Sequence, residues 1–594
     1  MELNSWAVAG MVIVGALTFY LGYHGSRTAN TTQDFLVARR MVRSRRNAAA
    51  ITGEYLSAAS FLGVAGLVLK DGVDALWYPV GFTAGYLALL LFVAAPLRRS
   101  GAYTLPDFVE ARLGSRSLRK LAMLFVVLIA FLYLTPQLQG AGLTLSTVLP
   151  VPSWVGAVVV TVLVVANVIG GGMRAVTLVQ AFQYWVKLFA IAAPTFVLFT
   201  VFMVAGQHGQ TQLSAPRAPN FTHNTTVTVK TPVTLQVSAP VRLRAQGTVD
   251  GFATDGGVLW NVAGTHTVAA GTKLEFRKGS PVPVVAEAKS TNADWLRPGS
   301  GGLSGVLADY SLIFALFAGT MGLPHVLVRF YTNPDGRAAR RTTLHVLLLL
   351  GIFYLFPTIL GALSRLYTPE LLVTGQTDAA VLLLPSKVLG GEIGQVFTAV
   401  IAAGAFAAFL STCSGLLVSI SGVLSTDVLP GRVRDFRFAA LIACVVPLVL
   451  ALGLRPEDIS IGVGMSFALA ASTFCPVLVL GIWWRGLTWV GAAAGIVTGG
   501  FLVVAALVVN IVSGYTGEWA PMILQQPALV TVPVAFVVVI AVSKATRDRA
   551  PADINAIMMR LHAPDRLGFF RDRDLPRFGA ADERLRLMPG KHRR

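Results

Sequence analysis

The sequence predicts an all-α polytopic membrane protein with about thirteen transmembrane helices and a small β-rich insert outside the membrane. Hydrophobic residues make up 54% of the 594 residues and charged residues only 13%, whereas soluble domains carry about 25% charged residues. Apolar runs of about eighteen residues or more recur along the chain, and each can span about 30 Å of hydrocarbon. The basic residues also gather in alternate loops between these runs.

The apolar runs are expected to be helices, because only helices and closed barrels satisfy their backbone hydrogen bonds in lipid. The predicted spans are 6–24, 49–69, 75–96, 121–146, 155–171, 177–205, 304–330, 343–365, 394–424, 437–454, 460–482, 489–511 and 526–543. The first has no basic residues before it, so a retained helix is expected rather than a cleaved signal peptide.

The net charge of +19 fits membrane topology better than nucleic-acid binding. Basic clusters follow every second span, at positions that include Arg43, Arg98, Arg329, Arg434 and Arg485. By the positive-inside rule these loops are cytoplasmic, which places the N-terminus outside and the C-terminus inside and favours an odd number of spans. We therefore expect a multi-pass protein of the plasma (inner) membrane with a lipid partner and no nucleic acid.

One segment does not belong to the membrane body. Residues 207–302 are polar and follow the sixth predicted span, so an outside N-terminus places them outside as well. Apolar and polar residues alternate in 225–229, 233–237, 241–244 and 273–276. Period two with β-branched residues indicates strands, although a disordered loop of β-prone composition is the alternative. The predicted units are spans one to six (1–206), an extracellular β-rich insert (207–302), spans seven to thirteen (303–544) and a basic cytoplasmic tail (545–594). The candidate partner of the insert is another component of the cell envelope.

The second span contains polar groups that are unexpected in lipid. Glu54 is ionisable, and such groups within a membrane helix are functional suspects. Gly53 weakens the helix, and the carbonyls of Gly53 and Leu56 lie one turn apart, so both would face an ion if the helix unwinds. The alternative is that Glu54 lies near the interface and pairs with a loop arginine.

The ninth span holds Ala408, Ser411 and Thr412 at positions i, i+3 and i+4, which share a helix face. A carbonyl and two hydroxyls there form a partial shell of oxygen ligands that suits sodium. The alternative is that these hydroxyls bond carbonyls of their own helix.

Three further spans carry polar residues. In the seventh, Thr320 precedes Pro324 and His325, where the proline must interrupt the helix and the histidine is either a titrating group or a structural one. The fourth contains Gln137. The sixth carries Gln180, Gln183 and Lys187 on one face, for which helix packing is the favoured interpretation, with the lysine reaching towards the interface.

Enzyme chemistry is not indicated. The sequence has no Walker loop, paired acid/base carboxylates, nucleophile elbow or His/Cys cluster, and its three cysteines lie in predicted spans. We expect neither a hydrolase nor an ATP-driven pump.

These stretches resemble the sodium/solute symporter family and, within it, bacterial cation/acetate symporters. Residues 53–63 (GEYLSAASFLG) are similar to that subfamily's Gly-acid-Tyr pattern followed by SAASFLG, and 319–325 (GTMGLPH) resembles its GTAGLPH segment. Residues 171–180 and 467–472 resemble further family segments. The similarity covers nearly all of the chain outside 207–302 and the tail. Departures are Glu54 in place of Asp, Leu178 in place of Trp, and the insert itself.

The resemblance implies a core of two inverted five-helix repeats with discontinuous helices. It implies sodium as the co-transported ion, and the corresponding ligands are Gly53, Leu56, Ala408, Ser411 and Thr412. The candidate substrate-binding residues between the two broken helices are Tyr55, Ser57, Gln137 and Thr320. The candidate gating and coupling residues are Glu54, Pro324 and His325.

The sequence thus predicts a secondary symporter, not an enzyme, that couples sodium influx to uptake of a small organic solute. A short-chain monocarboxylate such as acetate is the first candidate. Proton coupling, with Glu54 titrating, is one alternative. A membrane sensor on a transporter scaffold is another, but a tail of about fifty residues leaves little room for a signalling module.

Overall fold

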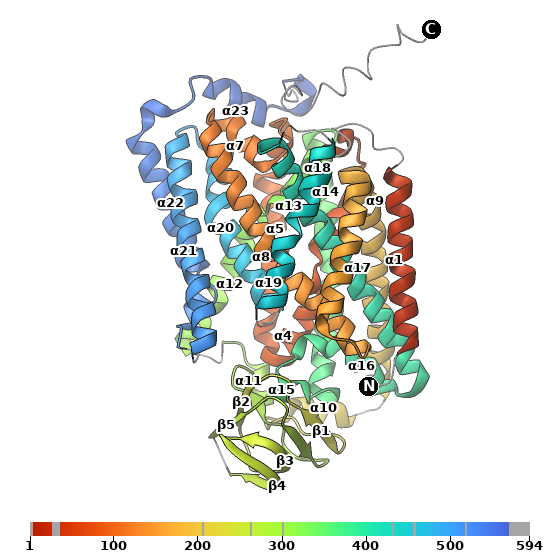
Figure 1. Cartoon of the computed structure of the whole chain (residues 1–594). Coiled ribbons are helices and arrows are strands. Elements are labelled where there is room, and N and C mark those ends of the chain that lie inside the picture. Colours follow the sequence, from red (N-terminus) through yellow and green to blue (C-terminus); the bar gives the residue numbers. More distant parts are fainter. Residues whose placement is uncertain are drawn as a thin grey trace.

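The computed structural model describes residues 4–26, 36–204, 207–261, 264–299, 302–429, 433–454, 459–516 and 519–569. Helices form a bundle, and one β-sheet lies at the end of the bundle where α1 begins, whereas α7 and α23 lie at the other end (Figure 1). The helices are α1 (Ser5–Ser26), α3 (Ser44–Tyr55), α4 (Val64–Asp71), α5 (Trp77–Phe92), α6 (Ala94–Arg99), α7 (Leu105–Leu113), α8 (Arg116–Val148), α9 (Ser153–Val204), α10 (Gln207–Ser214), α11 (Asn292–Leu296), α12 (Gly302–Gly322), α13 (Pro324–Val328), α14 (Gly336–Tyr367), α15 (Leu371–Thr374), α16 (Ala380–Leu389), α17 (Gly391–Asp427), α18 (Val433–Ala443), α19 (Val445–Gly453), α20 (Ile459–Trp483), α21 (Trp489–Thr516), α22 (Ala528–Ala545) and α23 (Ile554–His562).

Within the described residues, eleven helical stretches are long and apolar enough to cross a membrane, so the predicted count of thirteen is not confirmed. The stretch 59–92 covers parts of the second and third predicted spans, and the 52-residue helix α9 covers the fifth and sixth. Its 52 residues are two helices joined across a kink. It is interrupted at Gly172, whose φ of +56° favours glycine.

The sheet has seven strands, and every pairing in it is antiparallel. The order is β1-β6-β3-β5-β2-β7, with β4 paired to β3. The strands are β1 (Thr225–Thr228), β2 (Val233–Val237), β3 (Val241–Val249), β4 (Phe252–Trp260), β5 (Gly264–Val268), β6 (Lys273–Phe276) and β7 (Val284–Val285). Strands occur at all four stretches where the alternation predicts them, and alternate residues of β3 and β6 are buried. The buried face forms one apolar cluster with Leu371, Leu372 and Val373 of α15, so the sheet is packed onto the helical body.

Two helices are broken in the middle of the bundle. The first consists of α3, a break at Leu56, the π-helical turn η2 (Ala59–Gly63) and α4. The second consists of α12, a break at Leu323 and the short α13. Pro324 accounts for the second break, because it supplies no backbone N–H and holds the preceding residue in an extended conformation, with ψ of 114° at Leu323.

The basic tail is partly ordered. It contains α23, and Asp565 beyond this helix forms an ion pair of 2.9 Å with Arg99 of α6. The remainder of the tail, from 570 onwards, lies outside the described residues.

Candidate functional site

The site is built around the break in the first helix. Leu56 ends α3 with a ψ of 80°, so the last carbonyls of this helix turn away from a regular helical path. A Cβ on Gly53 would lie 2.4 Å from the Gln180 carbonyl oxygen, and only glycine therefore lets α3 pack this closely against α9. The close approach brings the end of α3 between α9 and α17.

The residues predicted to bind sodium meet at this point. The Ser411 hydroxyl lies 2.7 Å from the Gly53 carbonyl oxygen and 3.0 Å from that of Ala408. The Thr412 hydroxyl donates to the Glu54 carbonyl oxygen at 2.6 Å. Ser411 and Thr412 thus connect α17 to α3.

A lysine occupies the centre of this group. Lys187 is fully buried, and its Nζ donates to the Leu56 carbonyl oxygen at 2.8 Å, to the Ser411 hydroxyl at 2.7 Å and to the Gly53 carbonyl oxygen. The expectation that Lys187 reaches to the interface is wrong, because these oxygens satisfy its three N–H donors inside the protein. The position that the resemblance assigns to sodium thus holds the side-chain nitrogen of Lys187.

A buried ion pair lies beside the lysine. Arg329 Nε and Glu54 Oε2 are 2.5 Å apart, and both side chains are 1% exposed. Arg329 also donates to the Thr177 hydroxyl at 2.8 Å and to the Gln180 amide oxygen. The amide nitrogen of Gln180 in turn donates to the Ser411 carbonyl at 2.7 Å.

The ion pair corrects two expectations. Glu54 does pair with an arginine, and the pair is buried inside the bundle. Arg329, which the charge pattern places in a cytoplasmic loop, lies instead in the buried turn η4 (Arg329–Thr332). A charged pair of this kind is stable only because each member neutralises the other and has further hydrogen bonds.

The predicted substrate-binding residues lie between the two helix breaks. The Tyr55 and Thr320 hydroxyls form a hydrogen bond of 2.9 Å, which joins the first broken helix to the second. The Gln137 side-chain oxygen accepts from the backbone N–H of Ala58 at 2.9 Å, directly after the first break. Tyr55, Gln137, Thr320 and the neighbouring Ser57 are all buried, so this conformation closes the region from solvent.

Aromatic rings and unpaired polar atoms surround these residues. The ring of Tyr86 packs edge-on against Tyr55, with centroids 4.7 Å apart. His325 packs in the same way against Tyr133 at 5.1 Å. Both ring nitrogens of His325, the amide nitrogen of Gln137 and the hydroxyl of Tyr86 are buried without a hydrogen-bond partner among the described residues.

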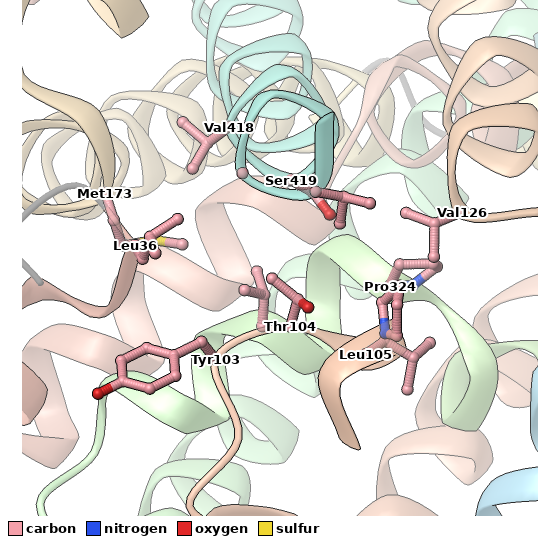
Figure 2. A pocket seen from close by; sticks show the side chains of 13 residues that line it. Leu36, Tyr103, Thr104, Leu105, Val126, Met173, Pro324, Val418 and Ser419 are labelled. Carbon is pink, nitrogen blue, oxygen red and sulfur yellow. The ribbon is translucent and has the colours of Figure 1, made fainter. Parts of the chain in front are cut away.

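A separate pocket lies beside the second break, and Leu105 of α7 and Pro324 of α13 both line it (Figure 2). Its lining is mostly apolar, with Pro324 at the start of α13 and Val418 on α17 among its residues. None of the four predicted substrate-binding residues lines this pocket. Of the predicted gating residues it reaches only Pro324.

Sequence reasoning missed the roles of Lys187 and Arg329 and did not select Tyr86 or Tyr133. The signal for Lys187 was present, since Gln180, Gln183 and Lys187 share one face of α9. Gln183 does act in packing as predicted, because it donates to Thr18 of α1 at 3.0 Å. Gln180 and Lys187 face charged and carbonyl groups instead.

Comparison with known proteins decides the family. Residues 35–244 and 265–499 match the model of the sodium:solute symporter family. The chain belongs to this family. The match extends into the β-rich segment through residue 244 and resumes at 265, so the similarity is not confined to residues outside 207–302 as the sequence suggested.

The symporter relatives span most of the chain. It is 28% identical to the uncharacterized symporter YwcA of Bacillus subtilis, over 89% of this chain and 91% of that protein. It is 29% identical to the monocarboxylic acid transporter of Corynebacterium glutamicum, over 86% of each. It is 30% identical to an uncharacterized symporter of Cupriavidus necator, over 87% of this chain and 88% of the relative.

The symporter fold is also found in a solved structure, the outward-open state of a Na⁺-coupled sialic acid symporter. The TM-score is 0.59 with 14% identity, over 91% of this chain and 98% of the other. At this identity the likeness concerns the fold. The family match and the eleven candidate spans support a multi-pass membrane protein that acts as a sodium:solute symporter.

Proposed function

We propose that this protein is a secondary active symporter that couples inward movement of a cation to uptake of a short-chain monocarboxylate such as acetate. One observation carries the proposal. Oxygen ligands from a broken helix and from α17 converge on one buried cationic position, next to a closed polar region between two helix breaks. Such breaks free backbone groups for ions and solutes at the middle of a transporter.

Sodium is the first candidate for the coupling cation, because the family is named for it. The proposed ligands are the carbonyl oxygens of Gly53, Leu56 and Ala408 and the hydroxyls of Ser411 and Thr412. The second candidate is the proton, and the observation that favours it is the side-chain nitrogen of Lys187 among these oxygens.

A small carboxylate suits the proposed solute region. The amide nitrogen of Gln137 and the hydroxyl of Tyr86 are donors without partners among the described residues, and His325 can add a third. Buried unpaired donors cost about 1–3 kcal/mol each, so a ligand that accepts hydrogen bonds would recover that energy. The name of the Corynebacterium glutamicum relative supports the same solute class.

The proposal is tested by uptake of radiolabelled acetate into proteoliposomes, under inward gradients of sodium or of protons. We expect gradient-driven accumulation in the wild type. Gln137→Leu should raise the KM for acetate at least tenfold, because it removes an unpaired donor. Gln183→Leu is the matched control, since this glutamine contacts Thr18 of α1 and not the solute region. An unchanged KM in Gln137→Leu would contradict the site.

We also propose that the sheet lies outside the cell and that α23 is cytoplasmic, as the charge pattern predicts. Ala253→Cys places a thiol on the exposed edge of β4, while the three native cysteines are buried. An impermeant maleimide should label this variant in intact cells. Labelling only after the cells are broken would reverse the orientation. Labelled cells could then be used to look for an envelope partner of the sheet.

A further inference from the structure

We propose that an anionic phospholipid binds in an apolar groove between α9 and the helix pair α18 and α19, with one acyl chain in the groove and the headgroup at Arg434 and Arg437. The groove lies on the outside of the bundle and shares no lining residue with the proposed cation and solute sites. The ligand differs from the transported solute, so the inference stands or falls independently of the proposed function.

The groove is large enough for a ligand. Its volume of about 430 Å³ lies within the range of about 300–1,000 Å³ that is typical of ligand sites. Four of its lining residues belong to 161–166 of α9, and the other four belong to 441–448 of α18 and α19. Val162 on one side is 61% exposed and Val445 on the other is 56% exposed, so the groove opens outwards. Both segments belong to candidate membrane spans, and the groove therefore faces lipid.

The chemistry of the lining suits hydrocarbon. Thr161 supplies the hydroxyl among the lining residues, and this hydroxyl already donates to the Ala157 carbonyl of its own helix at 2.8 Å. The lining thus offers no hydroxyl, amide or charged side chain for a polar ligand, which would lose its hydrogen bonds with water on entering. An acyl chain has no such bonds to lose.

The groove lies beside the junction of α18 and α19. α18 ends at Ala443 and α19 begins at Val445, and Pro447 in the first turn of α19 has no N–H to donate to the Ala443 carbonyl four residues back. Helices commonly kink at such a proline. Cys444, at the junction, is the one buried residue of the lining, so its small side chain forms the floor of the groove.

Two arginines extend the groove towards one end of the bundle. Arg434 and Arg437 precede Leu441 by seven and four residues, so the three side chains share one face of α18, and both arginines are exposed. α18 lies at the end of the bundle that carries α7 and α23, and α19 continues towards the sheet (Figure 1). Arg437 and Leu448 are about 16 Å apart along the helices, close to half of the hydrocarbon thickness of about 30 Å.

This arrangement matches the two parts of an anionic phospholipid. A guanidinium forms bidentate, charge-assisted hydrogen bonds with a phosphate group. Basic residues next to an apolar membrane surface also attract anionic headgroups. A lipid whose phosphate lies at Arg434 and Arg437 has its acyl chain at the depth of the groove, within one leaflet. Two arginines attract a headgroup with a net negative charge more strongly than a zwitterionic one.

A second copy of the chain is a poorer occupant of the groove. Two copies in one membrane have the same orientation, and a twofold interface joins the same surface of both. Such an interface on this face would bring Arg434 and Arg437 of one copy towards the same residues of the other. Like charges repel at close distance, so the charge on this face favours a lipid.

The first test uses the purified full-length protein in detergent and a phosphatidylglycerol that carries a diazirine in one acyl chain. After illumination we expect the label in the peptides that contain 161–166 and 441–448. Ala166→Phe places a ring in the groove from an exposed position and should lower this labelling at least threefold. Ala541→Phe, at an exposed position of α22, is the matched control and should be labelled as the wild type is. Equal labelling of the groove peptides in Ala166→Phe and the wild type would overturn the proposal.

The second test identifies the headgroup by competition. Unlabelled phosphatidylglycerol should displace the probe at a concentration at least tenfold lower than phosphatidylcholine with the same acyl chains. The double variant Arg434→Gln with Arg437→Gln should lose this preference. The control is Arg340→Gln with Arg341→Gln, at exposed positions near the start of α14, and should keep it. Equal competition by the two lipids in the wild type would reject an anionic headgroup.

A measurement of molecular mass in detergent distinguishes the lipid from a second copy. A wild-type dimer that Ala166→Phe converts to a monomer, together with no labelling of the groove peptides, would show that a second copy covers this face and would reject the proposal. Labelled groove peptides and a mass that Ala166→Phe leaves unchanged would support it. If the double arginine variant does not fold, the competition in the wild type still decides the headgroup.

Discussion

The two halves of the first broken helix, α3 and α4, both end in carbonyl groups that have no partner within the helix. A lysine donates to these carbonyls in α3, whereas an arginine donates to them in α4. The last carbonyls of a helix have no partner within it and need an outside donor. At the end of α3, Lys187 donates to the Leu56 carbonyl oxygen at 2.8 Å. At the end of α4, Arg365 of α14 donates to the Leu69 carbonyl oxygen at 3.3 Å, and the Trp295 indole donates to that of Val68 at 2.7 Å.

The difference lies in what each cation can do. Arg365 also donates to the Lys289 carbonyl at 2.8 Å and to Asn292 at 3.2 Å, so it ties α4 to the segment that follows the sheet. An arginine keeps its charge, and this end of the helix is therefore a permanent junction. Lys187 instead contacts oxygens that we propose as cation ligands. The same need for a donor thus gives a structural contact at one end of the broken helix and a contact within the proposed cation site at the other.

The largest expected effect is a loss of folding stability at the end of α3, where Glu54 and Arg329 form their ion pair. Arg329→Met leaves the Glu54 carboxylate buried without its partner, which should lower the free energy of unfolding by about 3–5 kcal/mol. Reversible unfolding in mixed micelles measures the loss. The double variant with Glu54→Gln should recover part of it, because the uncompensated charge is gone. No recovery would indicate that packing of the arginine, and not its charge, is what matters.

At the end of α4, Arg365→Met should lower the free energy of unfolding by about 2–3 kcal/mol, since a buried charged donor with three acceptors is lost. Limited proteolysis should also cut the 264–299 segment faster. The preference for a sodium or a proton gradient should stay that of the wild type. A changed preference would remove the distinction between the two ends.

A smaller effect is expected at Thr412, whose hydroxyl connects α17 to the Glu54 carbonyl at 2.6 Å. Thr412→Val should lower stability by about 1 kcal/mol and slow acetate uptake, because a contact between two helices is lost. The matched control is Thr473→Val on α20, where the hydroxyl bonds the Leu469 carbonyl of its own helix at 2.6 Å. Equal slowing of uptake in both variants would contradict a special role for Thr412.

The smallest effect is expected where the sheet segment meets α4. The charge of Lys70, 2.7 Å away, lowers the pKa of Glu287 below its ordinary value. The pair therefore adds stability above the unfolded-state pKa of about 4.3, and this is lost as the pH falls through the lower folded-state pKa. Because the Glu287 side chain is 62% exposed, we expect less than about 1 kcal/mol.

This last effect is measured as the change in Tm between pH 7 and pH 3. Glu287→Gln should show a smaller change than the wild type. Glu275→Gln, at an exposed position of β6, is the control and should behave as the wild type does. An identical pH dependence in Glu287→Gln and the wild type would show that the pair adds nothing.

Local patterns in the sequence determined much of this protein. Apolar runs gave the membrane helices, alternation gave four of the strands, and Pro324 marked the break before α13, because each depends on neighbouring residues alone. Motifs at 53–63 and 319–325 pointed to the family that the comparison confirms. The count of thirteen spans is not confirmed, because two of the eleven candidate stretches each contain residues of two predicted spans.

Only the tertiary structure decided which charges meet. Lys187 lies 131 residues from Leu56 and 224 from Ser411, and Arg329 lies 275 residues from Glu54. The charge pattern placed Arg329 in a loop, and Lys187 was expected to reach towards the interface, because a buried cation is unfavourable unless specific acceptors surround it. Those acceptors exist only after α3 breaks at Leu56 and packs between α9 and α17. Long-range packing, which no local period encodes, therefore placed a lysine where the sequence predicts sodium.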